Sequence, residues 1–169
     1  MNHKWDVRFL ELARHIAQWS KDPSTKCGAV ITDEKFVVSV GFNGFARFTD
    51  DSPEKYEDRD YKYENVIHAE DNAILSAKRD LTGCFIYSAT AVCSRCTARV
   101  IQAGIRRVII PCRAEDPFGY RSDWNQSFDS ARVQLNAADV GLTVLDLTGF
   151  NVVNLMGPQH PHNNRSKRV

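Results

Sequence analysis

At 169 residues, with 43% hydrophobic and 25% charged residues, the chain is long enough to bury one hydrophobic core, so a single globular domain is expected. The formal net charge of +1 provides no large field of one sign, which argues against nucleic acid as a partner. The N-terminal stretch "MNHKWDVRFLELARHIAQW" mixes charges too freely for a signal peptide, and no apolar run approaches the roughly 18 residues of a membrane span. We therefore expect a cytoplasmic protein with no membrane partner.

The first half of the chain predicts one helix and one hairpin. Apolar residues between Trp5 and Trp19 recur at intervals of three and four, the period of an amphipathic helix. Two β-rich runs, residues 27–31 and 36–42, follow and are joined by the polar turn "TDEK". Residues 45–65 are crowded with charged residues and tyrosines without a clear period. We expect a long exposed loop there, with a helical turn at most.

The second half alternates helices and strands. A helix over residues 69–78 precedes the strand "CFIYSA", the helix "SRCTARVIQAG" precedes the strand "IRRVIIP", and the helix "QSFDSARVQLNAADVG" precedes the strand "LTVLDL". This alternation predicts an α/β sandwich. The domain is expected over residues 1–150. Residues 151–169 are expected to form a mobile tail, because the final "GPQHPHNNRSKRV" has almost no apolar content to anchor it.

The five cysteines do not suggest disulfides, because they are odd in number and no secretory signal precedes them. Cys27, Cys84 and Cys112 lie in apolar or strand-like surroundings, where a small buried side chain is expected. Cys93 and Cys96 form a Cys-x-x-Cys pair at the start of a predicted helix, where the thiol pKa is lowered. Taken alone, this pair fits a redox pair, half of a structural zinc site or chance.

His68 adds a third metal-binding side chain to this pair. It too begins a predicted helix, one βα unit earlier, so the two helix starts are expected to face each other at one edge of the sheet. A structural zinc normally has four protein ligands, whereas three ligands and one open position are typical of a catalytic zinc. The remaining histidines lie in the first helix region or in the tail: His3, His15, His160 and His162.

Glu70 follows His68 by two residues and would lie beside such an ion without binding it. A zinc-activated water needs a group that takes its proton and returns it to the substrate, and a carboxylate can do both. The alternative is a helix-start charge that interacts with the macrodipole, worth about 0.3–1 kcal/mol.

These residues follow the His-x-Glu and Cys-x-x-Cys pattern of zinc deaminases. The chain resembles the cytidine deaminase superfamily and, within it, the deoxycytidylate (dCMP) deaminases. The resemblance rests on "SKDPSTKCGAVI" (20–31), "GFNG" (41–44), "HAEDNAI" (68–74) and "CSRCTARVIQAGIRRVI" (93–109). It implies a three-layer α/β/α sandwich around a mixed central sheet of about five strands. Two departures are Val92, where the family usually has proline, and Phe42 in place of the tyrosine of "GYNG".

The resemblance implies that His68, Cys93 and Cys96 hold one Zn²⁺ and that Glu70 is the proton shuttle. Water would be added at C4 of dCMP and ammonia released, giving dUMP for thymidylate synthesis. It also implies that Asn43 contacts the sugar, although a turn residue between two glycines is an equal alternative, and that the Ala69 backbone contacts the base. A second, structural zinc is not expected, because residues 45–65 contain no histidine or cysteine.

Phosphate contacts are expected from Lys26, assisted by Ser24, in the loop before the hairpin, although a solvated loop lysine is an equal alternative. The later loop "DPFGYRSDW" carries aromatic residues and an arginine that suit either a nucleotide, with Tyr120 as a substrate contact, or a subunit interface. The resemblance further implies a homohexamer that is activated by dCTP and inhibited by dTTP with Mg²⁺. The residues matching this regulatory site are Phe42, Asn43, Gly44, Phe118 and Arg121.

Two alternatives remain open from the sequence. A deaminase of another substrate, such as cytidine, a riboflavin precursor or an adenosine in tRNA, would share the same zinc motif. A non-catalytic zinc-stabilised module would use His68, Cys93 and Cys96 for folding and leave Glu70 without a role.

Overall fold

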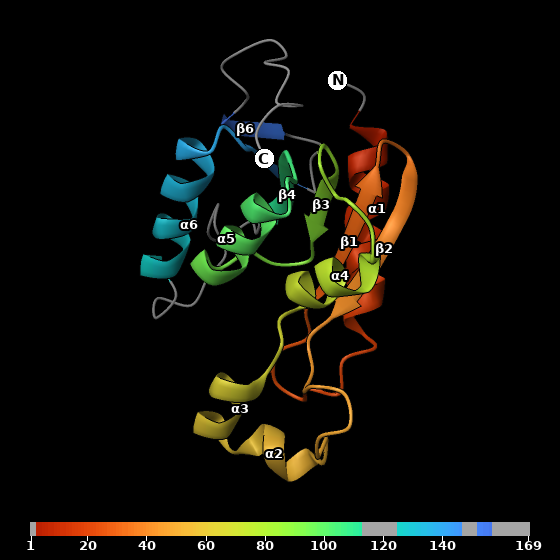
Figure 1. The fold of residues 1–169 in the computed structure, drawn as a ribbon, viewed down its shortest axis with the longest axis vertical. Coiled ribbons are helices and arrows are strands. Elements are labelled where there is room, and N and C mark those ends of the chain that lie inside the picture. The colour runs from red at the N-terminus through yellow and green to blue at the C-terminus, as the bar shows by residue number, and fades with distance from the viewer. Residues whose placement is uncertain (1–2, 113–124, 147–151, 157–169) are drawn as a thin grey trace.

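The structure, a computed structural model, describes residues 3–112, 125–146 and 152–156. These residues form one six-stranded mixed sheet with helices on both sides (Figure 1). The helices are α1 (Lys4–Ala17), α2 (Pro53–Glu57), α3 (Arg59–Asn65), α4 (Ala69–Ala77), α5 (Ser94–Gln102) and α6 (Asn125–Ala137). The strands are β1 (Gly28–Asp33), β2 (Phe36–Phe42), β3 (Phe85–Ser88), β4 (Arg107–Cys112), β5 (Gly141–Asp146) and β6 (Val152–Met156). None of the described helices is long and apolar enough to cross a membrane.

The strand order is β2-β1-β3-β4-β5-β6. Strands β3, β4 and β5 run parallel, because a helix connects each to the next, whereas the β1–β2 hairpin and β6 add antiparallel pairs at the two edges. Strand β6 falls within residues 151–169, which the sequence assigned to a tail, yet it pairs with β5 from Leu142↔Met156 to Leu145↔Val152. The sheet therefore has one strand more than expected, and residues 157–169 lie outside the described part of the chain.

The two faces of the sheet bury two separate clusters, as the strand period of two requires. Val30, Tyr87 and Ile109 pack with Phe9 and Leu10 of α1 on one face. Their neighbours in the same strands point to the other face, where they pack with buried residues of α4, α5 and α6. These neighbours are Ala29, Ile31, Ile86, Val108 and Ile110. This arrangement confirms the predicted three-layer α/β/α sandwich.

Residues 45–65 contain two short helices, α2 and α3, rather than the predicted exposed loop. They project beyond the sheet at the bottom of Figure 1. Pro53 occupies the start of α2, and the Asp58 carboxylate caps α3 by accepting a hydrogen bond from the Tyr61 amide at 3.0 Å. Tyr56 is buried, with its ring centroid 4.5 Å from that of Phe45. Helices of five and seven residues are too short to show an amphipathic period, which is why the sequence pattern missed them.

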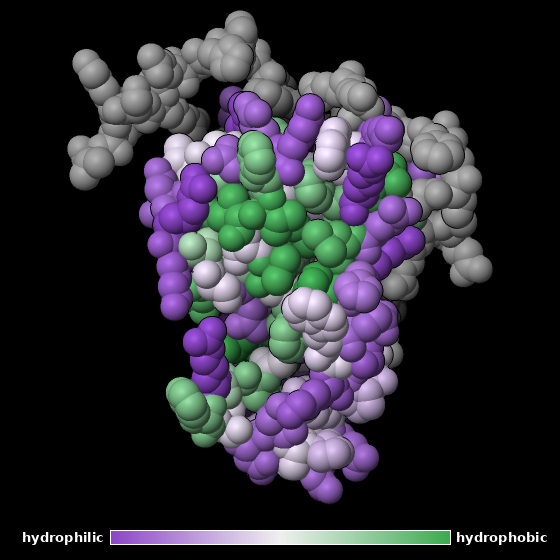
Figure 2. All heavy atoms as spheres, turned by 90° about the vertical axis from the view of Figure 1, so that its right-hand side faces the viewer, coloured by the Kyte–Doolittle hydropathy of each residue, from purple (hydrophilic) through white to green (hydrophobic). Residues whose placement is uncertain are grey.

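Strand β2 forms one edge of the sheet, and apolar side chains gather on the face of the molecule that carries it (Figure 2). Phe36 and Val37 of β2 are 76% and 48% exposed, and Trp19 packs edge-to-face on Phe42. An edge strand with exposed apolar residues is a ready surface for association with another chain.

The remaining cysteines partly follow the prediction. Cys84 is buried in the core, whereas Cys27 and Cys112 are only half-buried.

Candidate active site

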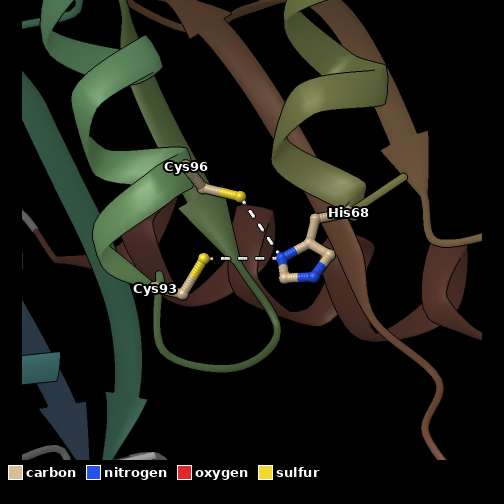
Figure 3. A group of neighbouring side chains, drawn as sticks. All are labelled: His68, Cys93 and Cys96. Carbon is tan, nitrogen blue, oxygen red and sulfur yellow. Dashed lines mark hydrogen bonds between the residues drawn. The ribbon is translucent and has the colours of Figure 1, made fainter. Parts of the chain in front are cut away.

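The starts of α4 and α5 meet beside the end of β3, as the sequence predicted (Figure 3). His68 is the N-cap residue of α4, Cys93 is the N-cap residue of α5, and Cys96 lies in the first turn of α5. Both N-caps have extended backbone conformations, which turn their side chains away from the helix axis and toward the facing helix. The side chains of His68, Cys93 and Cys96 therefore converge from two segments that are 25 residues apart in the chain.

The three donor atoms fit a zinc ion. His68 Nδ1 lies 3.5 Å from the Cys93 sulfur and 3.3 Å from the Cys96 sulfur, and all three atoms lie within 4.8 Å of one another. Tetrahedral bonds of about 2.3 Å to sulfur and about 2.0 Å to nitrogen separate these ligands by about 3.5 Å. Both cysteines are buried, so the sulfurs are already shielded from water. One imidazole and two thiolates form a donor set that zinc prefers.

The electrostatics of the site favour a thiolate at Cys93. A hydrogen bond from Cys96 holds the pKa of the Cys93 thiol well below its usual range against the effect of burial, and contact with His68 adds to the shift. The pKa of Cys96 is raised in turn, because it donates this hydrogen bond and is buried. The pKa of His68 is raised by its hydrogen bond with Cys93. The position of Cys93 at a helix N-terminus favours the same anionic state.

Glu70 lies in the first turn of α4 and is 3% exposed. Burial raises the pKa of its carboxyl group, an effect that the neighbouring His68 opposes. The Ser88 hydroxyl, at the end of β3, donates a hydrogen bond to Glu70 Oε1 at 2.8 Å and is itself fully buried. A carboxyl group with a raised pKa, held in one orientation beside a metal site, is suited to accept and return a proton near neutral pH.

Two contacts hold α4 in place. Gly41 of β2 faces its backbone, and a Cβ atom at Gly41 would overlap atoms of Ala69 and Ala73 and lie 2.9 Å from the Asn72 carbonyl carbon. Asp71 of α4 pairs with Arg99 of α5 at 2.7 Å. Close packing on the strand and an ion pair to the next helix thus fix the helix start that carries His68 and Glu70.

The "GFNG" turn lies against the same helix start. Gly44 and Ile67 form a β-bridge, with the Gly44 amide 3.1 Å from the Ile67 oxygen and the Ile67 amide 2.9 Å from the Gly44 oxygen. The Asn72 side chain donates a hydrogen bond to the Phe42 carbonyl oxygen at 2.7 Å. The structure therefore places the "GFNG" turn beside the start of α4, while the Ala69 side chain is fully buried.

The predicted phosphate contacts lie in the neighbouring loop, where both side chains already have partners. Lys26 is exposed, and its ammonium donates to the Ser20 carbonyl oxygen at 2.7 Å. The Ser24 hydroxyl donates to Asp22 Oδ1 at 3.0 Å and accepts from Lys62 at 2.7 Å. Phe118, Tyr120 and Arg121 lie outside the described residues.

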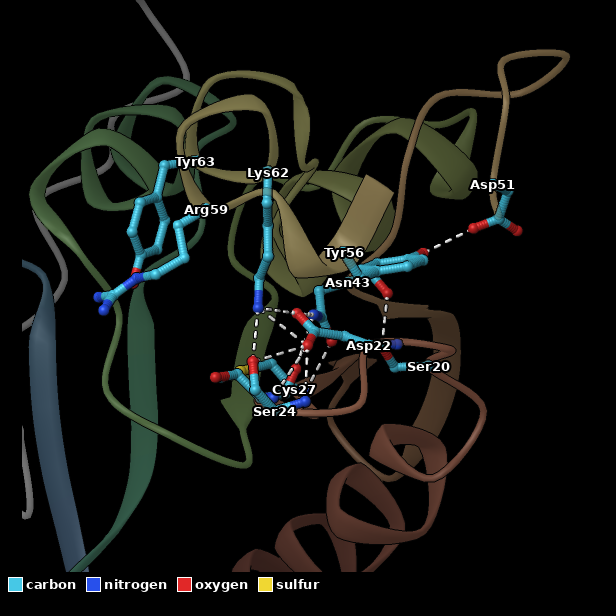
Figure 4. Close-up of polar contacts among 11 residues, drawn as sticks. Ser20, Asp22, Ser24, Cys27, Asn43, Asp51, Tyr56, Arg59, Lys62 and Tyr63 are labelled. Carbon is cyan, nitrogen blue, oxygen red and sulfur yellow. Dashed lines mark hydrogen bonds and ion pairs between the residues drawn. The ribbon is translucent and has the colours of Figure 1, made fainter. Parts of the chain in front are cut away.

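Three polar residues near the site were missed from the sequence: Ser88, Asp22 and Lys62. Ser88 ends a strand at the edge where the helix starts meet, and that position was its one available signal. Asp22 and Lys62 form a buried ion pair at 2.7 Å, in a network that includes Ser24 and Asn43 (Figure 4). They are 40 residues apart, and Lys62 belongs to the segment that was predicted to be an exposed loop.

The fold and the donor set define an α/β domain with a three-ligand site for a metal such as zinc. The family profile described as "Cytidine and deoxycytidylate deaminase zinc-binding region" matches residues 3–112. The chain therefore belongs to the cytidine and deoxycytidylate deaminase family, as the motifs suggested.

Individual relatives agree with this assignment. The chain is 43% identical over 147 residues to an uncharacterized deaminase of Aliivibrio fischeri, covering 87% of this chain and 97% of that protein. It is 37% identical over 113 residues to the deoxycytidylate deaminase of Homo sapiens, covering 63% of this chain and 64% of that protein, which is somewhat less than two thirds. The structure of a dCMP deaminase from the cyanophage S-TIM5, in complex with dCMP and dUMP, matches with a TM-score of 0.64 at 16% identity. That match covers 86% of this chain and 99% of that one. At this identity it supports the shared fold alone.

Proposed function

We propose that the protein is a zinc-dependent hydrolase that deaminates dCMP to dUMP and releases ammonia, supplying dUMP for thymidylate synthesis. The family assignment supports deamination, and a relative named deoxycytidylate deaminase supports dCMP as the substrate. The observation that carries the proposal is the buried Glu70 carboxyl group, two residues from His68 and held by Ser88. A zinc-stabilised structural module would have no need of a buried carboxyl group at that position.

The residues of the chain divide the chemistry between them. His68, Cys93 and Cys96 would hold the zinc ion, which, when bound, supplies the Lewis acidity that makes water nucleophilic near neutral pH. Glu70 takes a proton from water and gives it to N3 of the cytosine ring; it then takes the proton of the hydroxyl added at C4 and gives it to the departing amine, so that a C4 carbonyl and ammonia result. The hydrogen bond from Ser88 would hold the carboxyl group in one orientation for these transfers.

The nucleotide would be recognised by the segments that adjoin the helix start. The Ala69 backbone would contact the base, and Asn43 would contact the sugar. Ser24 and Lys26 lie in the loop tied to Asn43 and carry hydrogen-bond donors suited to a phosphate. Tyr120 is proposed as a further substrate contact on the strength of the sequence alone.

The test is ammonia release from dCMP by the zinc-loaded protein, compared with cytidine. Glu70→Gln is expected to lower kcat at least about 100-fold, within the range for loss of a general acid–base group, with zinc content unchanged. Glu64→Gln is the matched control, because Glu64 is exposed on α3. Equal kcat/KM for cytidine and dCMP would reject dCMP as the preferred substrate, and an active Glu70→Gln variant would reject the assigned chemistry.

We also propose regulation by dCTP and dTTP with Mg²⁺, assembly into a homohexamer and a cytoplasmic location. The "GFNG" turn supports regulation, because a nucleotide bound at Phe42, Asn43 and Gly44 would act directly on the helix start through the Gly44–Ile67 bridge. Phe118 and Arg121 are proposed for the same site from the sequence. The exposed apolar residues of edge strand β2 support self-association. Light scattering would give the oligomeric state, and deamination rates with dCTP or dTTP would give the direction of regulation.

A further inference from the structure

The Asp22–Lys62 ion pair has no role in the chemistry described above, yet both partners are buried. The Asp22 side chain is 1% exposed and the Lys62 side chain is 9% exposed, and Lys62 Nζ lies 2.7 Å from Oδ2 and 2.9 Å from Oδ1. The cost of removing two charges from water means that a buried pair is often no more stabilising than an apolar pair of the same volume. The presence of a buried ion pair beside a ligand site is therefore better explained by the groups that the pair positions than by a gain in stability.

Asp22 is the centre of a hydrogen-bond network that shapes the loop before β1. Its Oδ1 atom accepts from the amides of Ser24 and Thr25, at 2.9 and 3.0 Å. Lys62 donates to the Ser24 hydroxyl at 2.7 Å, so it fixes the same loop a second time. Hydrogen bonds from Lys62 and these amides outweigh the effect of burial and hold the pKa of Asp22 below its ordinary value. The carboxylate is thus ionised at neutral pH.

The same network fixes the orientation of the Asn43 amide. Its nitrogen donates to the Thr25 carbonyl oxygen at 2.9 Å and approaches Asp22 Oδ2 at 3.4 Å, while its oxygen accepts from the Cys27 amide at 2.8 Å. A flipped amide would place its oxygen against two acceptors, so one orientation is selected. Both amide hydrogens face protein acceptors, and the capacity left for a ligand is a lone pair on Oδ1, which suits a hydroxyl donor such as a sugar hydroxyl.

Lys62 also connects this network to the metal-binding segment. It lies in α3, six residues before His68, and the segment between them is pinned to the "GFNG" turn by the Gly44–Ile67 bridge. The ion pair therefore joins three segments that meet near the site: the loop of residues 20–27, the turn that holds Asn43, and the chain that leads into α4.

We propose that Lys62 is a positioning residue that acts through Asp22: the pair holds the loop of residues 20–27 and the Asn43 amide in the arrangement that receives the sugar of the substrate. This inference rests on the proposed deamination of dCMP. It concerns nucleotide binding rather than proton transfer, because Glu70 is held separately by Ser88.

The test compares Lys62→Met, Asp22→Asn, the double variant and Lys62→Arg with the wild-type protein. Each single neutral variant leaves one charge buried without its partner and destabilises the fold, whereas the double variant removes both charges and keeps the protein folded. Arg79→Met is the control, because Arg79 and Asp33 form an exposed ion pair whose side chains are 53% and 52% exposed.

Two readouts decide the question. In the double variant we expect KM for dCMP to rise at least about tenfold, since hydrogen bonds at a charged group are lost, while kcat changes less than about threefold. Hydrogen exchange is expected to accelerate at the amides of residues 20–27 and to stay unchanged in α6. Lys62→Arg keeps the charge and is therefore expected to show exchange as slow as in the wild type. Arg79→Met is expected to match the wild type in both readouts.

The proposal is overturned if the double variant keeps the wild-type KM, or if its loop amides exchange as slowly as in the wild type. A kcat loss as large as the KM rise would also overturn it, because the pair would then act on the chemistry. Failure of the proposed function is distinguishable: the wild-type protein itself would not deaminate dCMP, and hydrogen exchange would still report whether the pair orders the loop.

Discussion

Ser88→Ala gives a direct test of how Glu70 is held. The Ser88 hydroxyl is fully buried and donates to Glu70 Oε1 at 2.8 Å, so its removal leaves a buried carboxylate oxygen without this donor. A hydrogen bond to a charged group contributes about 1.5–3 kcal/mol. If the bond becomes stronger by this amount on going from the ground state to the transition state, its loss corresponds to a decrease in kcat of about 10- to 150-fold.

The assay is steady-state ammonia release at saturating dCMP, together with urea unfolding of the same preparations. Ser39→Ala is the matched control, because Ser39 is also a buried serine and donates to the Ala73 carbonyl oxygen of α4 at 2.7 Å. Both variants are expected to lose about 0.5–3 kcal/mol of stability, but Ser39→Ala should keep its kcat. Equal kcat values for the two variants would refute the idea that Ser88 orients Glu70.

Three further predictions follow from the site and its supports. Gly41→Ala is expected to destabilise the fold by about 1–3 kcal/mol and to weaken zinc binding, because the new methyl group would push β2 from α4; urea unfolding and zinc titration would show it, and an unchanged midpoint would contradict the close packing. Chelation of the metal is expected to lower the melting temperature of the wild-type protein, and adding Zn²⁺ should restore it. Cys93→Ser should have a low melting temperature with or without the chelator. A wild-type melting temperature that does not change with the chelator would count against the site. The difference in unfolding free energy between wild type and Asp22→Asn is expected to be constant above about pH 4 and to shrink as the pH falls through the lowered pKa of Asp22. The reason is that a carboxylate with a depressed folded-state pKa loses its contribution to stability on protonation. Urea midpoints would be measured from pH 7 to pH 3, and a difference that stays constant over this range would contradict the prediction.

The sequence by itself identified the candidate metal ligands, because each part of this set is encoded locally. His68 and Glu70 are two residues apart, and Cys93 and Cys96 are three apart, so a helix start at each motif places the side chains without reference to the rest of the chain. The periods of α1 and of the strands predicted the two sides of the sandwich in the same way, since period and buried face are local properties.

Only the tertiary structure decided what holds these groups in place. Ser88 reaches Glu70 across 18 residues of chain and Lys62 reaches Asp22 across 40, and no spacing rule links such positions, because their proximity results from packing and chain reversal. The short elements α2, α3 and β6 were also decided by the tertiary structure. They are too short to show a hydrophobic period, and they are stabilised by capping, buried contacts or pairing with β5. Local spacing thus specified the candidate metal ligands and the candidate proton carrier, and long-range packing specified their orientation.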